Sequence, residues 1–241
     1  MPGTTIARAE SVRGEVTLRR RETDGALELL VNGVFVMDTA ESTTETALAD
    51  LALGRLTTTH EPGARDRSPV KVLIGGLGLG FTLRRLAGNT LVDEIIVVEI
   101  EGALIDWHRS GLVPATTEII RDPRLRLVEG DVREVVATIP DGTLDALILD
   151  VDNGPGFLVY DDNAAVYQSA FLATCHAALR DGGALVVWSA DEAPCVDVAL
   201  RRTFGAVDHL ATEVPFGTRR EHYHTYVGVK GRAEDPPCQA R

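Results

Sequence analysis

The residues that most clearly could do chemistry are three glycines of a short turn, Gly76, Gly78 and Gly80, which follow an apolar run over 70–75. Glycine carries no side chain, so its backbone can approach a ligand closely. The next apolar run ends in a single acid, Glu99, 19 residues after Gly80. An acid at this distance can accept hydrogen bonds from both hydroxyls of a ribose. The order strand, glycine turn, helix, strand, acid therefore indicates a nucleoside-containing cofactor bound by these three glycines and Glu99.

Further acids stand at the ends of two later apolar runs, where ligands of open α/β sheets bind. Asp131 can accept a hydrogen bond from an adenine amino group, and it is also a good N-terminal cap for a helix over 132–139. These two roles are compatible. Asp150 and Asp152 precede Asn-Gly-Pro, and a carboxylate there can orient an attacking amine or hydroxyl and accept its proton. A solvated turn is the alternative, but the position at a strand end favours a catalytic site.

The elements that must position these residues alternate along the chain. We expect strands at 70–75, 94–99, 124–129, 144–150, 183–189 and 224–230, and helices at 80–87, 101–111, 131–139, 162–180 and 194–204. Such alternation is typical of βαβ units. It predicts an α/β fold with a doubly wound, mostly parallel, Rossmann-like sheet, in which the final strand pairs antiparallel at an edge.

The chain divides into three segments. Residues 14–39 carry strand patterns and turn signals, which indicate a small antiparallel unit. From Ser42 the pattern changes to that of a helix. We therefore expect an N-terminal β-unit over 1–41, a Rossmann-like cofactor-binding catalytic domain over 42–231, and a disordered tail over 232–241.

Composition narrows the class of protein. The chain has 241 residues, of which 44% are hydrophobic and 25% charged, as in a soluble globular protein with a core. Its net charge of −12 argues against nucleic acid or an anionic membrane as a partner. The three cysteines are far apart and odd in number, so neither a disulfide framework nor a metal site is expected and the cytoplasm is the default location.

Other residues have weaker claims to function. His222 and His224 would share one face of a strand, as a metal or acceptor edge or as a plain sheet edge, and the plain edge is favoured. Arg219 and Arg220 could clamp a substrate carboxylate or lie in a solvated turn. Trp188 could line an acceptor pocket, although a core position with its N–H satisfied is favoured.

In the order of these residues, the chain resembles the spermidine synthase family, aminopropyltransferases that share the class I methyltransferase fold. The resemblance runs from about Leu30 to Gly231. The family's Ile-Gly-Gly-Gly-Asp-Gly-Gly stands here as Ile-Gly-Gly-Leu-Gly-Leu-Gly (74–80), and its Val-Val-Glu-Ile-Asp as Val-Val-Glu-Ile-Glu (97–101). Its Gly-Asp stands at 130–131, and its Asp-Ser-x-Asp-Pro-x-Gly-Pro loop is similar to a shortened run over 150–155.

The resemblance implies roles for the acids. Glu99 would hold the ribose hydroxyls and Asp131 the adenine. Asp150 would face the cofactor or the acceptor near the sulfonium, and also orient the acceptor, while Asp152 would accept its proton. The family also implies a homodimer.

One departure from the family decides the expected donor. The aspartate of the family's glycine turn binds the amine of decarboxylated S-adenosylmethionine, and Gly78 stands in its place. The residues with which the family binds its polyamine also differ here, near Val36 and over 45–47. The sequence therefore predicts an S-adenosylmethionine-dependent methyltransferase acting on a small-molecule acceptor, for which an amine suits the acids. The alternatives are a polyamine aminopropyltransferase using decarboxylated S-adenosylmethionine and a non-catalytic nucleoside-binding protein.

Overall fold

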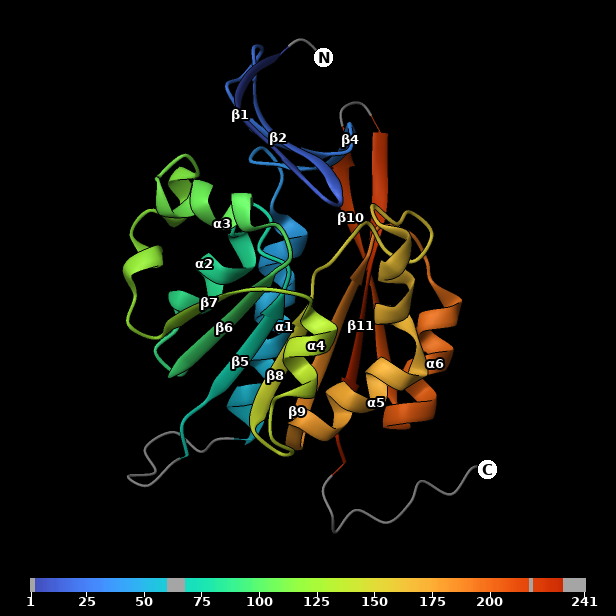
Figure 1. The fold of residues 1–241 in the computed structure, drawn as a ribbon. Coiled ribbons are helices and arrows are strands. Elements are labelled where there is room, and N and C mark those ends of the chain that lie inside the picture. Colours follow the sequence, from blue (N-terminus) through green and yellow to red (C-terminus); the bar gives the residue numbers. More distant parts are fainter. Residues whose placement is uncertain (1–2, 60–67, 217–218, 232–241) are drawn as a thin grey trace.

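The centre of the protein is a seven-stranded sheet, seen in a computed structural model that describes residues 3–59, 68–216 and 219–231. Its strands are β5 (Lys71–Gly75), β6 (Glu94–Glu99), β7 (Leu125–Glu129), β8 (Leu144–Leu149), β9 (Leu179–Ser189), β10 (Val207–Phe216) and β11 (Arg219–Val229). Their order is β10-β11-β9-β8-β5-β6-β7 (Figure 1). Neighbouring strands from β7 to β9 pair parallel, and β11 is antiparallel to both of its neighbours. The predicted α/β, mostly parallel fold is confirmed.

Helices cover both faces of this sheet, as a doubly wound fold requires (Figure 1). They are α1 (Thr43–Thr59), α2 (Phe81–Ala87), α3 (Gly102–Arg109), α4 (Val132–Ala137), α5 (Ser169–Ala178) and α6 (Pro194–Phe204). One core cluster joins α1 and α2 to the sheet, and a second joins α4, α5 and α6 to it. Because β5 and β8 are apolar on both faces, they contribute to both clusters.

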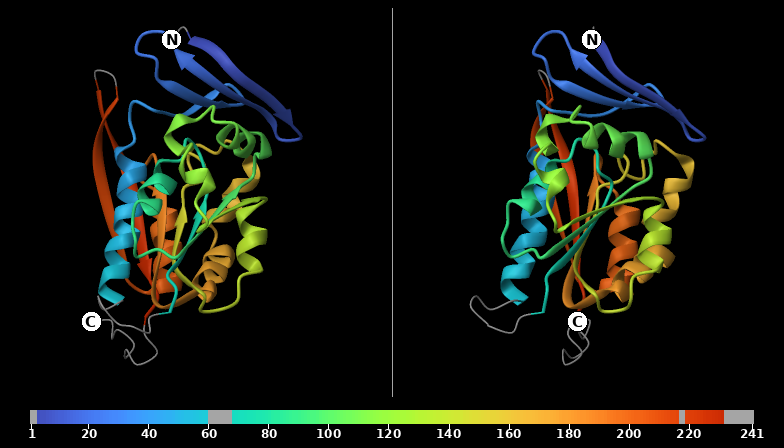
Figure 2. Two further views of the ribbon diagram at one scale, coloured as in Figure 1. Left: turned by 90° about the vertical axis from the view of Figure 1, so that its left-hand side faces the viewer. Right: turned by 60° about the vertical axis from the view of Figure 1, so that its left-hand side comes forward.

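A separate four-stranded antiparallel sheet precedes α1. Its strands are β1 (Gly3–Ser11), β2 (Gly14–Arg21), β3 (Leu27–Val31) and β4 (Val34–Asp38). Apolar side chains of β2 and β3 pack against Phe81, Leu104 and Trp107 of α2 and α3. The small sheet therefore lies across one end of the parallel sheet (Figure 2). The domain limits at 41 and 231 stay a prediction, and the expected tail, 232–241, lies outside the described residues.

Four elements differ from the sequence prediction. The strands β1 and β10 were not expected, and each is the edge strand of its sheet with mostly exposed side chains, so neither has the apolar run that marks a buried strand. Because β10 takes the edge, β11 is an interior strand and the prediction of an edge position is wrong. The expected helix over 162–180 divides into a 3₁₀ segment, Asp161–Tyr167, and α5, and β9 begins directly afterwards at Leu179.

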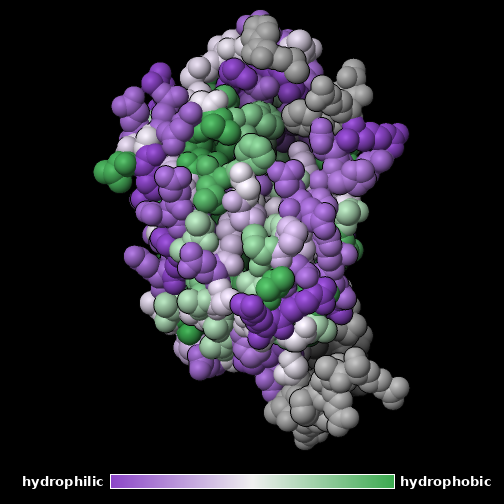
Figure 3. Space-filling model, turned by 90° about the vertical axis from the view of Figure 1, so that its right-hand side faces the viewer, coloured by the Kyte–Doolittle hydropathy of each residue, from purple (hydrophilic) through white to green (hydrophobic). Residues whose placement is uncertain are grey.

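The surface is mixed in polarity. On the face turned to the reader in Figure 3, hydrophilic side chains predominate, and hydrophobic ones gather in a patch in the upper half of the view. No helix of the described ranges is long and apolar enough to cross a membrane.

Candidate active site

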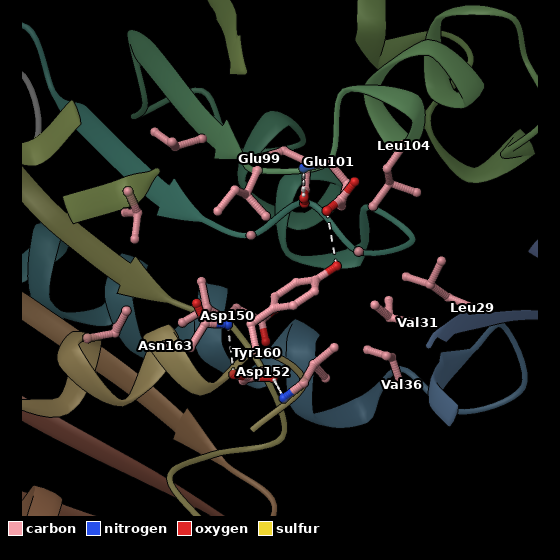
Figure 4. A pocket seen from close by; sticks show the side chains of 18 of the residues that line it. Leu29, Val31, Val36, Glu99, Glu101, Leu104, Asp150, Asp152, Tyr160 and Asn163 are labelled. Carbon is pink, nitrogen blue, oxygen red and sulfur yellow. Dashed lines mark hydrogen bonds between the residues drawn. The ribbon is translucent and has the colours of Figure 1, made fainter. Parts of the chain in front are cut away.

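A pocket lies between the carboxyl ends of the parallel strands and the N-terminal sheet (Figure 4). It encloses about 1020 Å³ that no protein atom fills, part of it open to solvent. The N-terminal sheet supplies an apolar wall, and the strand ends supply acids. The apolar wall is formed by Val16, Leu29, Val31 and Val36.

The pocket brings together most of the sequence-predicted site residues. Its lining includes Gly76, Gly78, Glu99, Asp131, Asp150 and Asp152. Gly80 is not in the lining. A Cβ at Gly80 would lie 2.3 Å from Cγ2 of Thr116, so this glycine allows the turn to pack against the segment after α3 rather than against a ligand.

The glycine turn has a backbone that other residues rarely adopt. Its three predicted glycines have φ values of +94°, +50° and +82° at Gly76, Gly78 and Gly80. A Cβ at Gly76 would lie 2.1 Å from the carbonyl oxygen of Asp150, which is backbone and cannot give way. Glycine at 76 is therefore required for the strand end of β5 to pass beside that of β8.

The position of Gly78 is already filled by another side chain. A Cβ there would lie 2.6 Å from Sδ of Met37, a residue of β4 that also lines the pocket. The same sulfur accepts a hydrogen bond of 3.2 Å from the backbone N–H of Leu79. Met37 thus occupies the space that an aspartate at position 78 would need.

Glu99 is buried at the end of β6, with 7% of its surface exposed. Its Oε2 accepts the backbone N–H of Leu77 at 2.9 Å, and its Oε1 accepts that of Glu101 at 2.8 Å. Burial raises the pKa of Glu99, and these two N–H donors lower it in part. A carboxylate can accept about four hydrogen bonds, so two sites on Glu99 are left for a ligand.

Asp131 caps the helix α4, which confirms the structural role read from the sequence. Its side chain accepts the backbone N–H of Arg133 at 2.8 Å. The Arg133 guanidinium also donates to both carboxylate oxygens and holds the pKa of Asp131 below its usual range. Asp131 lines the pocket as well, and its contact with adenine stays a prediction.

Asp150 and Glu45 are two acids of the pocket whose pKa values are raised. Asp150 lies at the end of β8, and its Oδ2 accepts the hydroxyl of Thr82 at 3.1 Å. Burial raises its pKa to about 6. Burial and the nearby charge of Asp150 raise the pKa of Glu45, in the first turn of α1, to about 7. Two carboxylates that resist ionisation beside each other favour a cation between or near them.

Asp152 holds the loop that follows β8. Its Oδ1 accepts the backbone N–H of Val159, and its Oδ2 accepts Nδ2 of Asn163 at 2.7 Å. Its φ is +63°, an uncommon value outside glycine. Both carboxylate oxygens are thus engaged within the loop, whereas Asp150 receives one hydroxyl.

Sequence reasoning missed Glu101 and Tyr160. Glu101 is 5% exposed, and its Oε1 accepts Nε of Arg13 at 2.9 Å and the hydroxyl of Tyr160 at 3.0 Å. The Tyr160 ring lies across the pocket, between Glu99 and Glu101 on one side and Asp150 and Asp152 on the other (Figure 4). The second acid of the motif at 97–101 was a usable signal for Glu101. No site role was predicted for Tyr160, because its contact joins segments 59 residues apart.

Trp188 lines the pocket, contrary to the favoured core position. Its indole N–H is buried and has no hydrogen-bond partner in the described part of the chain. The ring meets that of Tyr223 edge to face, with centroids 5.2 Å apart. This side of the pocket is therefore aromatic.

His222, His224 and Arg220 lie outside the pocket lining. His224 stacks on His209, and their ring nitrogens approach to 2.9 Å. His222 is exposed. Arg220 pairs with Glu213, and the side chain of Arg219 is outside what the structure describes. Within the described ranges, no three His, Cys, Asp or Glu side chains are arranged to hold a metal ion.

The charged side chains in the described lining of the pocket are all acidic. Its lining contains six acids and, within the described residues, no lysine, arginine or histidine. Arg13 and Arg133, outside the lining, pair with Glu101 and Asp131. A cationic ligand would relieve the repulsion among the other four acids, and a ligand carboxylate would meet no basic side chain in the lining. The six acids are Glu45, Glu99, Glu101, Asp131, Asp150 and Asp152.

Comparison with known proteins identifies the family. The model of the spermine/spermidine synthase domain matches residues 56–201. The chain belongs to this family. Polyamine aminopropyltransferase 1 of Pseudomonas aeruginosa is 33% identical over 155 residues, which are 64% of this chain and 50% of that protein. Putrescine N-methyltransferase 4 of Nicotiana tabacum is 32% identical over 126 residues, 52% of this chain and 31% of that one.

Members of the family with solved structures share the fold. A spermidine synthase in complex with the transition-state analogue AdoDATO superposes with a TM-score of 0.77 at 20% identity, over 95% of this chain and 74% of that one. The likeness at this identity concerns the fold. The chain spans half the length of the Pseudomonas relative and a smaller share of the tobacco one.

These findings correct the expected reaction. The prediction of a methyltransferase using intact S-adenosylmethionine is contradicted, because the family match and the Pseudomonas aminopropyltransferase support the alternative better. The error came from giving decisive weight to the acid missing at Gly78. The pocket instead holds six other acids, Glu45 and Glu101 among them, and no basic side chain to pair with the carboxylate of intact S-adenosylmethionine.

Proposed function

We propose that the protein is a polyamine aminopropyltransferase, which transfers an aminopropyl group from decarboxylated S-adenosylmethionine to an amine. The single observation that carries the proposal is the one-sided charge of the pocket, with six acids and no basic side chain in the described lining. Such a donor combines a sulfonium with a primary ammonium, and a polyamine acceptor is also cationic. Both therefore suit this pocket, and the printed names of the relatives agree with an amine acceptor.

The residues present fit an adenosyl donor. Gly76 and Gly78 present backbone to the pocket, and Glu99 keeps two acceptor positions beyond its two backbone donors. The apolar wall of the N-terminal sheet can cover the flat face of a base. When bound, the donor supplies a carbon already activated by the sulfonium, so that attack by the amine nitrogen breaks the carbon–sulfur bond and leaves 5′-methylthioadenosine.

The protein must then align the amine and remove one proton. Asp150 suits the role of base, because its carboxylate is partly buried, receives one hydroxyl, and has a pKa raised to about 6. Asp152 suits the role of holding the loop, because both of its oxygens are engaged by Val159 and Asn163. The sequence had instead predicted Asp152 as the base and Asp150 as the acid that orients the acceptor. Glu45 is placed to receive an ammonium group of either substrate.

A titration and an assay test the proposal together. Calorimetry should show tighter binding of decarboxylated S-adenosylmethionine than of the intact compound. Release of 5′-methylthioadenosine should then require a polyamine such as putrescine. Tighter binding of the intact compound, or methyl transfer to putrescine, would overturn the proposal, and binding of neither compound would favour a non-catalytic protein.

A further inference from the structure

The peptide group between Gly78 and Leu79 is held at both of its ends by side chains from other elements. Its carbonyl oxygen, on Gly78, lies 2.9 Å from Nε2 of His108 on α3. Its N–H, on Leu79, donates to Sδ of Met37 on β4 at 3.2 Å. A peptide that follows a glycine with positive φ has access to a flipped orientation, because the glycine lacks a Cβ. Two contacts from opposite sides select one orientation.

The protonation state of His108 follows from its partners. A carbonyl oxygen can only accept, so Nε2 carries the proton and donates to Gly78. The ring is 1% exposed, and burial lowers its pKa, so the imidazole is neutral. With the ring neutral, Nδ1 accepts from the hydroxyl of Thr116 at 2.6 Å, a shorter contact than the 3.2 Å between the same hydroxyl and the carbonyl oxygen of Val113. Thr116 is fully buried, and together the two side chains fix one tautomer.

The same two side chains also support the next glycine of the turn. A Cβ at Gly80 would lie 2.3 Å from Cγ2 of Thr116 and 3.2 Å from Cε1 of His108. The turn thus packs against the pair while hydrogen bonding to it. His108 and Thr116 are not in the pocket lining, whereas Gly78 and Met37 are. Any effect of the pair on a ligand must pass through the turn.

From these contacts we infer that His108, held by Thr116, is a positioning residue for the adenosyl donor, because it fixes the orientation of the peptide between Gly78 and Leu79 at the pocket wall. The inference rests on the proposed function only in naming the donor. It assigns a role to a buried histidine that touches neither the pocket nor the reacting atoms. Loss of the bond should weaken donor binding without changing the chemical step.

Two substitutions at His108 distinguish the effect of its hydrogen bond to Gly78 from the effect of its side-chain volume. His108→Leu removes the donor to Gly78, and His108→Gln can keep an N–H near the place of Nε2. Loss of one such bond should raise the Kd for 5′-methylthioadenosine and the KM for decarboxylated S-adenosylmethionine about 3–10-fold in His108→Leu, with kcat within about twofold. His108→Gln should restore most of the loss. Thr116→Val, which frees Nδ1, should give a smaller rise in the same two constants, and Thr116→Ser should reverse it.

The matched control loses a buried hydrogen bond elsewhere. The Tyr226 hydroxyl, outside the pocket lining, accepts the N–H of Ala193 at 2.7 Å. Tyr226→Phe should lower the melting temperature and leave the Kd for 5′-methylthioadenosine unchanged.

Nitrogen-15 NMR of the wild-type protein should show the His108 proton on Nε2, a readout that needs no ligand and no folded variant.

The possible failures are distinguishable. A proton on Nδ1, or a folded His108→Leu protein with wild-type Kd, would overturn the positioning role while the proposed function stands. A rise in Kd that His108→Gln and Thr116→Ser fail to reverse would also overturn it, since that pattern reports packing alone. If the wild-type protein binds neither adenosyl compound, the proposed function itself fails.

Discussion

At the scale of single residues, the chemistry depends on which of two neighbouring aspartates accepts the proton. Asp150 and Asp152 are two positions apart, yet their surroundings differ. Asp150 receives a single hydroxyl donor, and Asp152 holds a loop with both of its oxygens. Asp150→Asn should lower kcat about 10²–10⁴-fold, the usual contribution of a general base, with a much smaller change in donor affinity. Steady-state kinetics beside donor calorimetry measures this, and an active Asp150→Asn enzyme would remove Asp150 from the mechanism.

Glu99 should matter for binding rather than for the chemical step. Glu99→Ala should weaken the binding of 5′-methylthioadenosine at least about tenfold, because both the ligand contacts and the support of the turn at Leu77 are lost. The backbone N–H groups of Leu77 and Glu101 would also lose their acceptor, so the melting temperature should fall. Calorimetry on protein shown to be folded by circular dichroism measures the binding effect. Unchanged affinity would mean that the ribose lies elsewhere.

Met37 and Gly78 should be coupled. Gly78→Asp alone should weaken donor binding, because its Cβ would lie 2.6 Å from the Met37 sulfur. Met37→Ala should open that space, and asparagine and aspartate tolerate positive φ better than most residues. The double variant should therefore bind decarboxylated S-adenosylmethionine more tightly than Gly78→Asp does. A double-mutant cycle on the Kd measures the coupling, and strictly additive effects would contradict it.

At the scale of elements, the loop after β8 can be tested by exchanging two side chains. Asp152→Asn would place an amide N–H against Nδ2 of Asn163, so the loop should open and the acceptor KM should rise. Adding Asn163→Asp restores a hydrogen bond with donor and acceptor exchanged. If Asp152 only positions the loop, the double variant should recover most activity. If Asp152 is the base, as the sequence suggested, the double variant should stay inactive, and that result would reverse our assignment.

The elements also show what could be predicted from the sequence. The buried strands β5, β6 and β8 are continuous apolar runs, and the turn and acids at their ends followed from position alone. The edge strands β1 and β10 lack such runs, because their side chains face water. Within the pocket, the contacts of Met37 and Tyr160 could not be predicted from the sequence, since each joins distant segments. The packing of the N-terminal sheet over the strand ends brings Met37 to the pocket, whereas Tyr160 reaches it from the loop after β8.

At the scale of the whole molecule, the acids of the pocket should make stability depend on pH in an unusual direction. The folded state raises the pKa of Asp150 from 3.8 to about 6 and that of Glu45 from 4.5 to about 7. Between pH 4 and 7 the folded protein therefore binds more protons at these two groups than the unfolded chain does. Stability contributed by them must fall as pH rises through this window and must stay low above it.

The net charge of −12 acts in the same direction, because self-repulsion grows as the acids ionise, so the contribution of the pair has to be isolated by substitution. Glu45→Gln should have a smaller drop in melting temperature from pH 5 to pH 8 than the wild-type protein, whereas Asp50→Asn, an exposed acid of the same helix, should keep the wild-type drop. A polyamine should raise the wild-type melting temperature more at pH 8 than at pH 5, because the ionised pair then binds the cation that it lacks in the free protein. Equal drops in the three proteins, or stabilisation by the polyamine that does not depend on pH, would show that Glu45 and Asp150 do not form the cation-binding part of the pocket.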